Sequence, residues 1–108
     1  MFTSLGDAHK WMYSYFWEAK MYDIAIEHLK FAANLGEVQA QTLVGDTYRK
    51  AEHVKQDFVC SAQYYLMAAN AGDYVAQSWM SYYYRTGTGV NVDSVLADIY
   101  GTMSNKQR

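Results

Sequence analysis

The sequence predicts an all-α fold, a short α/α solenoid of about three stacked helical hairpins. Three observations lead to this prediction: an internal repeat of 36 residues, helical runs separated by glycine, and a chain without proline. Because no proline is present, nothing forces a helix to stop from within. One hairpin cannot bury its apolar face alone, so repeated hairpins gain their stability by stacking.

The repeat is visible when residues 25–60 are placed over residues 61–96. Eleven of the 36 paired positions are identical without a gap, whereas unrelated segments would share about two or three. The identical residues of the first copy are Ala32, Ala33, Asn34, Gly36, Ala40, Gln41, Tyr48, Arg49, Val54, Asp57 and Val59. This degree of self-similarity indicates a true repeat.

Six helices are expected, over residues 5–19, 21–34, 37–49, 57–70, 73–84 and 94–103. A chain of 108 residues forms one domain, because chains of this size rarely divide into two cores. Within the domain we expect a degenerate N-terminal helix (1–20), a first repeat (21–56), a second repeat (57–92) and a C-terminal capping helix with a polar tail (93–108).

Helix ends are marked by aspartate and glycine. Asp57, Asp73 and Asp93 precede helical runs, where a carboxylate can cap the first turn. Gly72 ends one helix, and Gly87 and Gly89 permit the turn after the next one. The same turn in the first copy, residues 50–53, has lost both glycines.

Small residues in both copies allow neighbouring helices to approach closely. These are Ala32, Ala33, Ala40 and their partners 36 positions later. Tyr48 and Tyr84 occupy one repeat position, and we expect Tyr84 to be buried between hairpins.

Composition excludes several classes of function. The formal net charge is −2 and the pI is about 5.8, so the chain lacks the basic face of a nucleic-acid binder or a polybasic membrane-surface protein. A single cysteine, Cys60, excludes an internal disulfide framework and favours a reducing compartment. No charged leader precedes an apolar run, and no stretch approaches the ~20 apolar residues of a spanning helix. We expect a cytoplasmic protein, or a periplasmic one if a signal peptide has been removed.

The motifs resemble the Sel1-like repeat, a TPR-like unit. Residues 72–77 (GDYVAQ) and 84–90 (YRTGTGV), followed by Asp93, match its pattern of G-D-x-x-A-Q and Y-x-x-G-x-G-V-x-x-D. The resemblance covers about residues 21–101 and implies a concave face that holds a protein partner. Sel1-like proteins act as adaptors in degradation complexes, bacterial signalling and host-cell entry, and some small bacterial members give immunity against a secreted toxin. Some cysteine-rich members are associated with β-lactamase activity or binding, but this chain has a single cysteine, which argues against that branch.

No residue set demands catalysis or a cofactor. Gly87-Thr88-Gly89 lacks the rest of a nucleotide-binding motif. His9, His28 and His53 lie on different segments without metal-ligand spacing, so no metal is expected. Cys60, placed in mid-helix, is interpreted as a small apolar residue rather than a nucleophile. The aspartates at the helix starts are explained as caps.

The candidate binding surface is a stripe along the helices over residues 37–49 and 73–84. Tyrosine and arginine are enriched where truncation costs most binding energy. We define the stripe by its residues, Gln39, Thr42, Asp46, Arg49, Tyr74, Val75, Ser78, Tyr82 and Arg85. Scattered surface tyrosines without a partner are the alternative interpretation.

A second candidate surface lies on the N-terminal helix, which is apolar around nearly its whole circumference. Its large rings are Trp11, Tyr13, Tyr15 and Trp17. A terminal helix normally has a polar outer face. The rings therefore either cover the open end of the first hairpin or contact a partner or a second copy.

These observations predict a non-enzymatic protein that binds one protein partner. A dedicated inhibitor, similar to an immunity protein that neutralises a bacterial toxin or effector, suits the size of the chain. The alternatives are an adaptor that acts as a homodimer in a signalling or secretion complex and, last, a small hydrolase.

Overall fold

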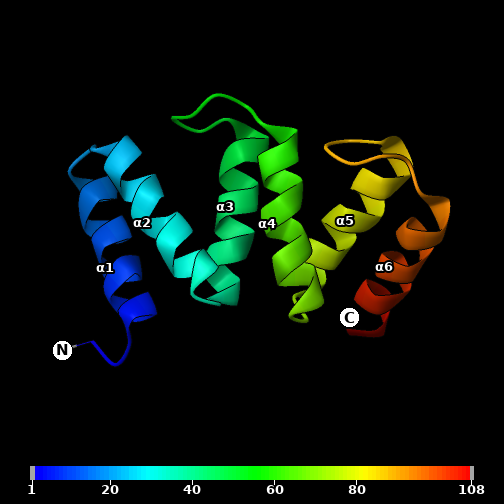
Figure 1. Cartoon of the computed structure of the whole chain (residues 1–108), viewed down its shortest axis with the longest axis horizontal. Helices are drawn as coiled ribbons and strands as arrows, with labels where there is room; N and C mark the ends of the chain where they lie inside the picture. The colour runs from blue at the N-terminus through cyan, green and yellow to red at the C-terminus, as the bar shows by residue number, and fades with distance from the viewer. Residues whose placement is uncertain (1, 108) are drawn as a thin grey trace.

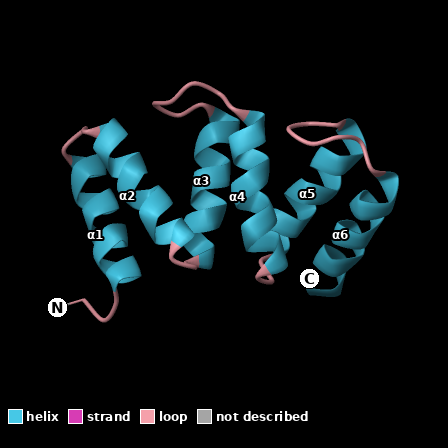
Figure 2. Ribbon diagram, viewed as in Figure 1, coloured by secondary structure: helices cyan, strands magenta, loops and turns pink. Residues whose placement is uncertain are grey.

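The computed structural model describes residues 2–107, and these residues form six α-helices joined by short loops, with no strand among them (Figures 1 and 2). The helices are α1 (Leu5–Glu18), α2 (Tyr22–Asn34), α3 (Val38–Lys50), α4 (Phe58–Asn70), α5 (Tyr74–Thr86) and α6 (Ser94–Gln107). The predicted all-α solenoid is confirmed. No helix in this part of the chain combines the length and apolar character needed to cross a membrane.

The helices follow one another in a row, with the two ends of the chain at opposite ends of the molecule (Figure 1). Packing is most extensive within the pairs α1/α2, α3/α4 and α5/α6, and α2/α3 and α4/α5 join these pairs. The extents are 43 × 30 × 19 Å. The molecule is therefore a thin slab whose faces are formed by helix sides.

The predicted aspartate caps are confirmed. The side chain of Asp57 accepts the N–H of Cys60 at 3.0 Å, and Asp73 accepts that of Ala76 at 2.9 Å. Asp93 accepts the N–H of Leu96 at 3.0 Å. Each cap satisfies a first-turn donor that no helical carbonyl can reach, which is worth about 1 kcal/mol.

The core lies where small residues of the repeat meet. Ala32, Ala33 and Ala40, with their counterparts Ala68, Ala69 and Ala76, are fully buried. The buried amides of Gln41 and Gln77 donate to the carbonyls of Ala33 and Ala69 at 3.0 and 3.1 Å. Alanine is required at these positions because a larger side chain would separate the two backbones.

The expected burial of Tyr84 is wrong. Tyr83 is the buried residue, 1% exposed, and its ring contacts Phe58 and Tyr65 of α4. Tyr84 is half-buried at the edge of α5, where it stacks on Tyr100 of α6. Successive helical residues point about 100° apart, so only one of the two can face α4.

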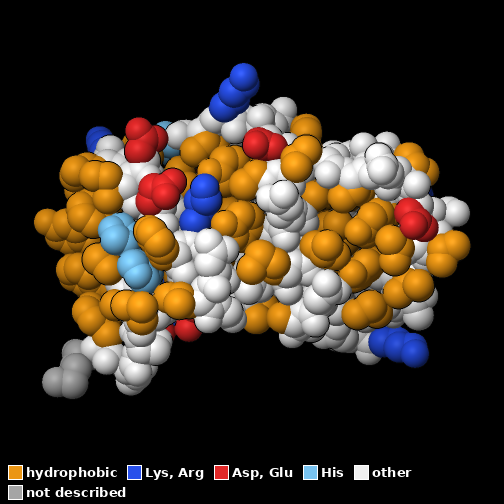
Figure 3. Space-filling model, in the orientation of Figure 1, with side chains coloured by type: hydrophobic (Ala, Val, Ile, Leu, Met, Phe, Trp, Pro, Cys, Tyr) orange, Lys and Arg blue, Asp and Glu red, His pale blue; other side chains and the backbone are white. Residues whose placement is uncertain are grey.

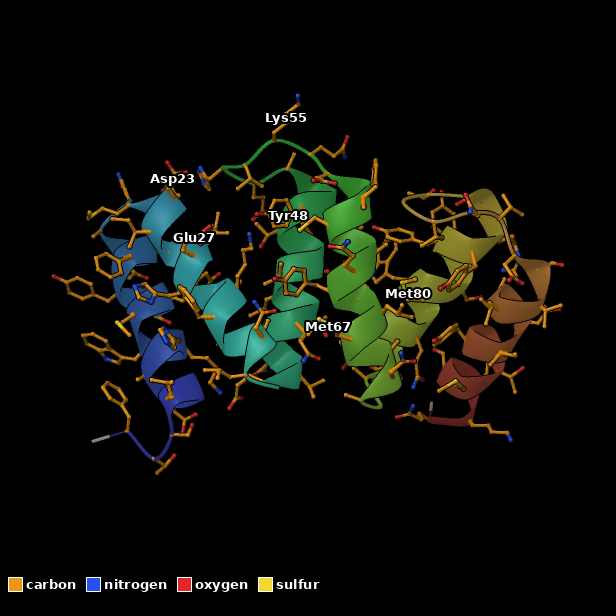
Figure 4. All side chains as sticks on the ribbon, viewed as in Figure 1. Asp23, Glu27, Tyr48, Lys55, Met67 and Met80 are labelled. Atoms are coloured by element: carbon orange, nitrogen blue, oxygen red, sulfur yellow. The ribbon has the colours of Figure 1, made fainter. Side chains whose placement is uncertain are left out.

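The turn after α5 needs its glycines. Gly87 and Gly89 have φ of +72° and +69°, and a Cβ on Gly89 would lie 2.1 Å from the Phe58 carbonyl oxygen. The α3–α4 loop adopts positive φ at the same repeat positions, with Ala51 at +60° and His53 at +61°. His53 stacks on Tyr22, with ring centroids 3.6 Å apart. Figure 4 shows Lys55 at the outer tip of this loop.

Replacing Ala51 by glycine is expected to raise the free energy of unfolding by about 0.5–1 kcal/mol, because a Cβ in the left-handed region costs more than the entropy that glycine loses. Urea unfolding would measure the change. Ala71→Gly is the matched control, since Ala71 ends α4 with φ −87° and should lose stability. Equal destabilisation of both variants would contradict this account.

Candidate functional site

Helices α1, α3 and α5 share a register that a backbone hydrogen bond defines. The carbonyls of Phe16, Tyr48 and Tyr84 accept the N–H of the residue that precedes the next helix, at 2.8, 3.2 and 2.8 Å. Those donors are Met21, Asp57 and Asp93. Eight residues before each acceptor stands an alanine: Ala8, Ala40 and Ala76. Residues of the three helices can therefore be compared position by position.

The predicted stripe contains exposed residues and half-buried residues whose side chains contact neighbouring helices. The exposed residues are Gln39 on α3 and Tyr74, Val75, Tyr82 and Arg85 on α5. The half-buried residues are Thr42, Asp46 and Arg49 on α3 and Ser78 on α5. The half-buried residues hold the helices together, which leaves the exposed five as the accessible surface.

Arg49 is the half-buried residue of the stripe that contacts Asp46, Tyr65 and Trp79. Its Nε donates to the Tyr65 hydroxyl at 2.8 Å, and a terminal nitrogen pairs with Asp46 at 3.2 Å. The guanidinium lies 4.0 Å from the centroid of the Trp79 ring, a cation–π contact. Arg49 thus connects α3 and α4 with α5.

Tyr65 completes this junction. Its hydroxyl donates to Asp46, and burial raises the pKa of this hydroxyl, so it remains a protonated donor. The Tyr65 ring is fully buried and stacks on Trp79 with an interplanar angle of 5°. Met80 lies beside it between α4 and α5 (Figure 4). The junction provides a rigid base beneath the exposed residues of α5.

Polar contacts of the other stripe residues also join helices. The Thr42 hydroxyl donates to Asp73, the cap of α5, at 3.1 Å. The hydroxyls of Ser78 and Ser104 are 2.5 Å apart and connect α5 with α6. Arg85 approaches Asp98 at 3.4 Å, and its side chain is 60% exposed.

Two of the four N-terminal rings form an exposed surface. Trp11 and Tyr15 are 53% and 54% exposed and stack on each other at 5.4 Å. Tyr13 packs toward the core cluster around Leu29, and Trp17 packs against Tyr22 and His53. Tyr13 and Trp17 therefore cover the first hairpin, as one interpretation predicted, whereas Trp11 and Tyr15 are uncovered and their contact with a partner or a second copy stays a prediction.

The register explains why Trp11 and Tyr15 are uncovered. They occupy the positions of Trp79 and Tyr83, which α5 uses to pack on α4. No helix precedes α1 among the described residues. The pair is thus an internal packing surface without its usual neighbour.

A third surface was missed by the sequence analysis. Apolar side chains cover much of the face drawn in Figure 3, where acidic and basic groups are scattered singly. We define the third surface by Phe31, Met67 and Met103, which occupy one repeat position and are 52%, 38% and 36% exposed. They stand 36 residues apart on α2, α4 and α6, so the repeat period was the signal that could have found them.

The histidines and Cys60 are the side chains that could bind a metal ion or act as a nucleophile. Among residues 2–107, no group of three His, Cys, Asp or Glu side chains is placed to hold a metal ion. Cys60 lies in the first turn of α4 rather than in mid-helix, and it is half-buried. Burial raises the pKa of its thiol, which disfavours the nucleophilic thiolate.

His9 and His28 connect α1 with α2, their Nδ1 atoms 2.9 Å apart and their rings stacked with Phe31 and Phe16. Burial lowers the pKa of His28, with a smaller contribution from His9 and opposition from Glu27. The folded state therefore favours the neutral ring.

Lowering the pH through the ordinary histidine pKa of about 6.5 is expected to reduce stability, because the unfolded chain binds the proton more readily than the folded one. Thermal unfolding at constant ionic strength would measure the loss. His28→Phe should lessen this pH dependence while retaining the stacked ring. An unchanged slope in that variant would rule out the histidine pair as its cause.

Structural comparison places the chain among solved Sel1 repeat proteins. It is similar to c5321, a protective antigen present in uropathogenic Escherichia coli strains displaying an SLR fold, with a TM-score of 0.86 and 25% identity over 94% of this chain and 23% of c5321. It is also similar to a Sel1 repeat protein from Oxalobacter formigenes, with a TM-score of 0.82 and 32% identity over 94% of this chain and 81% of that protein.

A third similar structure is the Helicobacter pylori cysteine rich protein B, with a TM-score of 0.70 and 24% identity over 76% of this chain and 62% of that protein. The chain thus spans less than a quarter of c5321 and less than two thirds of the Helicobacter pylori protein. No protein-family model matches the chain, and no curated protein matches it. The identity to the Oxalobacter formigenes protein extends over most of both sequences, and on that ground this chain belongs to the Sel1-like repeat family.

Proposed function

We propose that this chain is a non-enzymatic module that binds one protein partner through the exposed residues of the stripe. The observation that carries the proposal is Tyr82, 52% exposed beside Arg85, on a helix fixed from below by the Arg49–Trp79 contact. Large amphipathic side chains on a rigid base lose little entropy when they bind. The binding energy is expected to concentrate at this pair.

One partner suits the dimensions of the molecule. The accessible surface is 6318 Å², and a standard interface covers about 800 Å² on each side. One such interface would occupy about an eighth of this surface, and the broadest face, 43 × 30 Å, has room for one of them but not for two. We therefore propose a dedicated inhibitor, similar to an immunity protein that neutralises a bacterial toxin or effector, rather than a scaffold for several clients.

The proposal contains no catalytic step. The titratable groups at the centre of the stripe, Asp46 and Arg49, are paired with each other and with Tyr65. Such an arrangement stabilises packing and leaves neither group available as an acid or base. A small hydrolase is therefore not the favoured candidate.

Affinity capture with the tagged chain, followed by mass spectrometry, would identify the partner. Replacing Tyr82 and Arg85 together by alanine is expected to weaken the complex by about 2 kcal/mol, or about thirtyfold in Kd, because both side chains would be buried at the contact. Helicity and melting temperature should stay unchanged, since both residues are exposed.

Met67→Ala is the matched control, because Met67 is exposed on α4, whereas the stripe residues belong to α3 and α5. Calorimetry with the purified chain and its purified partner would measure the Kd of both variants. An unaltered Kd in the double variant, together with a weakened complex in Met67→Ala, would transfer the interface to the surface of α2, α4 and α6.

Self-association is the second candidate, because Trp11 and Tyr15 repeat the packing pair of α5 without a covering helix. In this candidate the chain is an adaptor that acts as a homodimer. Stacked exposed rings of this size are typical of interfaces.

Under the second candidate, sedimentation should give a mass above the 12.4 kDa of one chain. Changing Trp11 and Tyr15 to lysine should then yield a folded monomer, because like charges would face each other across the contact. Tyr74→Lys, on the stripe, serves as the control and should leave the mass unchanged. A monomeric wild-type chain would eliminate this candidate.

A further inference from the structure

The α3/α4 and α5/α6 pairs are built to the same plan, but one ring is missing from the second. In the first pair, the Tyr65 ring covers Gly45 so closely that a Cβ on Gly45 would lie 2.5 Å from it. Thirty-six residues later, Ser81 replaces Gly45 and Gly101 replaces Tyr65. The Cβ and hydroxyl of Ser81 fill part of the volume that the phenol ring takes in the first pair, and the rest stays open between α5 and α6.

That space is an open groove of about 270 Å³. Its lining is polar: Ser78, Ser81 and Arg85 from α5, and Gly101, Ser104 and Asn105 from α6. In the α3/α4 pair the counterparts of Ser104 and Asn105 are the buried alanines Ala68 and Ala69. Asn105 is exposed at the groove, whereas Ser104 is buried and its hydroxyl contacts the Ser78 hydroxyl and the Tyr74 carbonyl.

The equivalent arginines of the two pairs, Arg49 and Arg85, have different surroundings. Arg49 is 21% exposed and donates to the Tyr65 hydroxyl at 2.8 Å. Its counterpart Arg85 is 60% exposed and has a longer contact of 3.4 Å with Asp98. Tyr82 is the counterpart of Asp46, which accepts a hydrogen bond from the Tyr65 hydroxyl, so no carboxylate occupies that position in the second pair.

We propose that the groove between α5 and α6 binds a tyrosine side chain of a partner protein, on the outer side of the place that Tyr65 fills between α3 and α4, because the Cβ of Ser81 occupies part of that place. The ring would lie over Ser81 and Gly101, and its hydroxyl would accept a hydrogen bond from Arg85. In the first pair Trp79 covers the outer side of Tyr65. In the second pair no helix follows α6 within the described residues, so the partner supplies this cover.

This inference rests on the proposed function, since Ser78 and Arg85 belong to the stripe, and it specifies what the partner inserts. The groove can be tested without the partner by titrating the isotope-labelled chain with N-acetyl-tyrosinamide and following amide shifts by NMR. We expect saturable shifts at Gly101, Ser81 and Arg85, with an affinity of roughly millimolar order because a single ring makes few contacts. N-acetyl-phenylalaninamide should bind severalfold more weakly, and Arg85→Ala should remove that difference.

The decisive variant is the double change Ser81→Gly with Gly101→Tyr, which rebuilds the Gly45–Tyr65 pair inside the chain. It should abolish the probe-induced shifts and raise the melting temperature, because the groove is then filled from within. Both positions change together because a Cβ on Gly101 alone would lie 3.0 Å from the Ser81 hydroxyl. Ser81→Gly with Gly101→Leu fills the groove without a hydroxyl and gives a second blocked variant if the first does not fold.

Absence of saturable shifts at Gly101 in the wild-type chain, or shifts that persist in a folded blocked variant, would overturn the inference. Loss of the probe site with the protein complex intact would overturn this inference alone. Unaltered partner binding in the Tyr82 and Arg85 variant would contradict the proposed function and would leave the probe titration on the wild-type chain as an independent result, so the two failures remain distinguishable.

Discussion

The stack depends on a buried amide that ties the end of one helix to the beginning of the next. Gln41 reaches back to the Ala33 carbonyl, and Gln77 makes the same bond to Ala69. Each bond gives a second donor to a carbonyl in the last turn of a helix, which also accepts the N–H of Gly36 or Gly72 at 3.1 Å. The side chain reaches that carbonyl only because alanines line the crossing. The alanines and the glutamine therefore form one constraint, which sets the angle at which each helix leaves the last.

Most of the fold could be predicted because the alanines and the glutamine are identical in the two copies of the repeat. The repeat, the caps Asp57 and Asp93 and the helices α2 to α5 follow from positions that are the same in both copies. Asp73, in contrast, has Glu37 as its counterpart, which makes no side-chain cap. The register of α1 could not be predicted in this way. Met21 follows Phe16 by five residues, whereas Asp57 follows Tyr48 by nine, so the shorter turn moves α1 out of the 36-residue frame. Only the backbone hydrogen bond reveals that its rings match those of α5.

The candidate site was less predictable, because a repeat shows which positions are equivalent but not what faces them. Tyr84 is identical in the two copies and lies at the edge of its helix, whereas Tyr83 varies, with Thr47 as its counterpart, and is buried. Four of the five stripe residues on α5 are exposed, and the fifth, Ser78, is half-buried. It also included Arg49, which a sequence cannot separate from a free arginine because its partners come from α4 and α5.

The differences between equivalent positions carry the functional argument. A solenoid keeps its stability at positions that stay the same, so positions that change are free to acquire another role. Arg49 and Arg85 are the same residue at the same place, and a neighbouring ring decides whether the guanidinium is engaged. Where Tyr65 is present, the arginine belongs to the core; where Gly101 replaces it, the arginine is exposed beside an open groove. The loss of one internal ring thus converts a packing contact into a surface that a partner can complete.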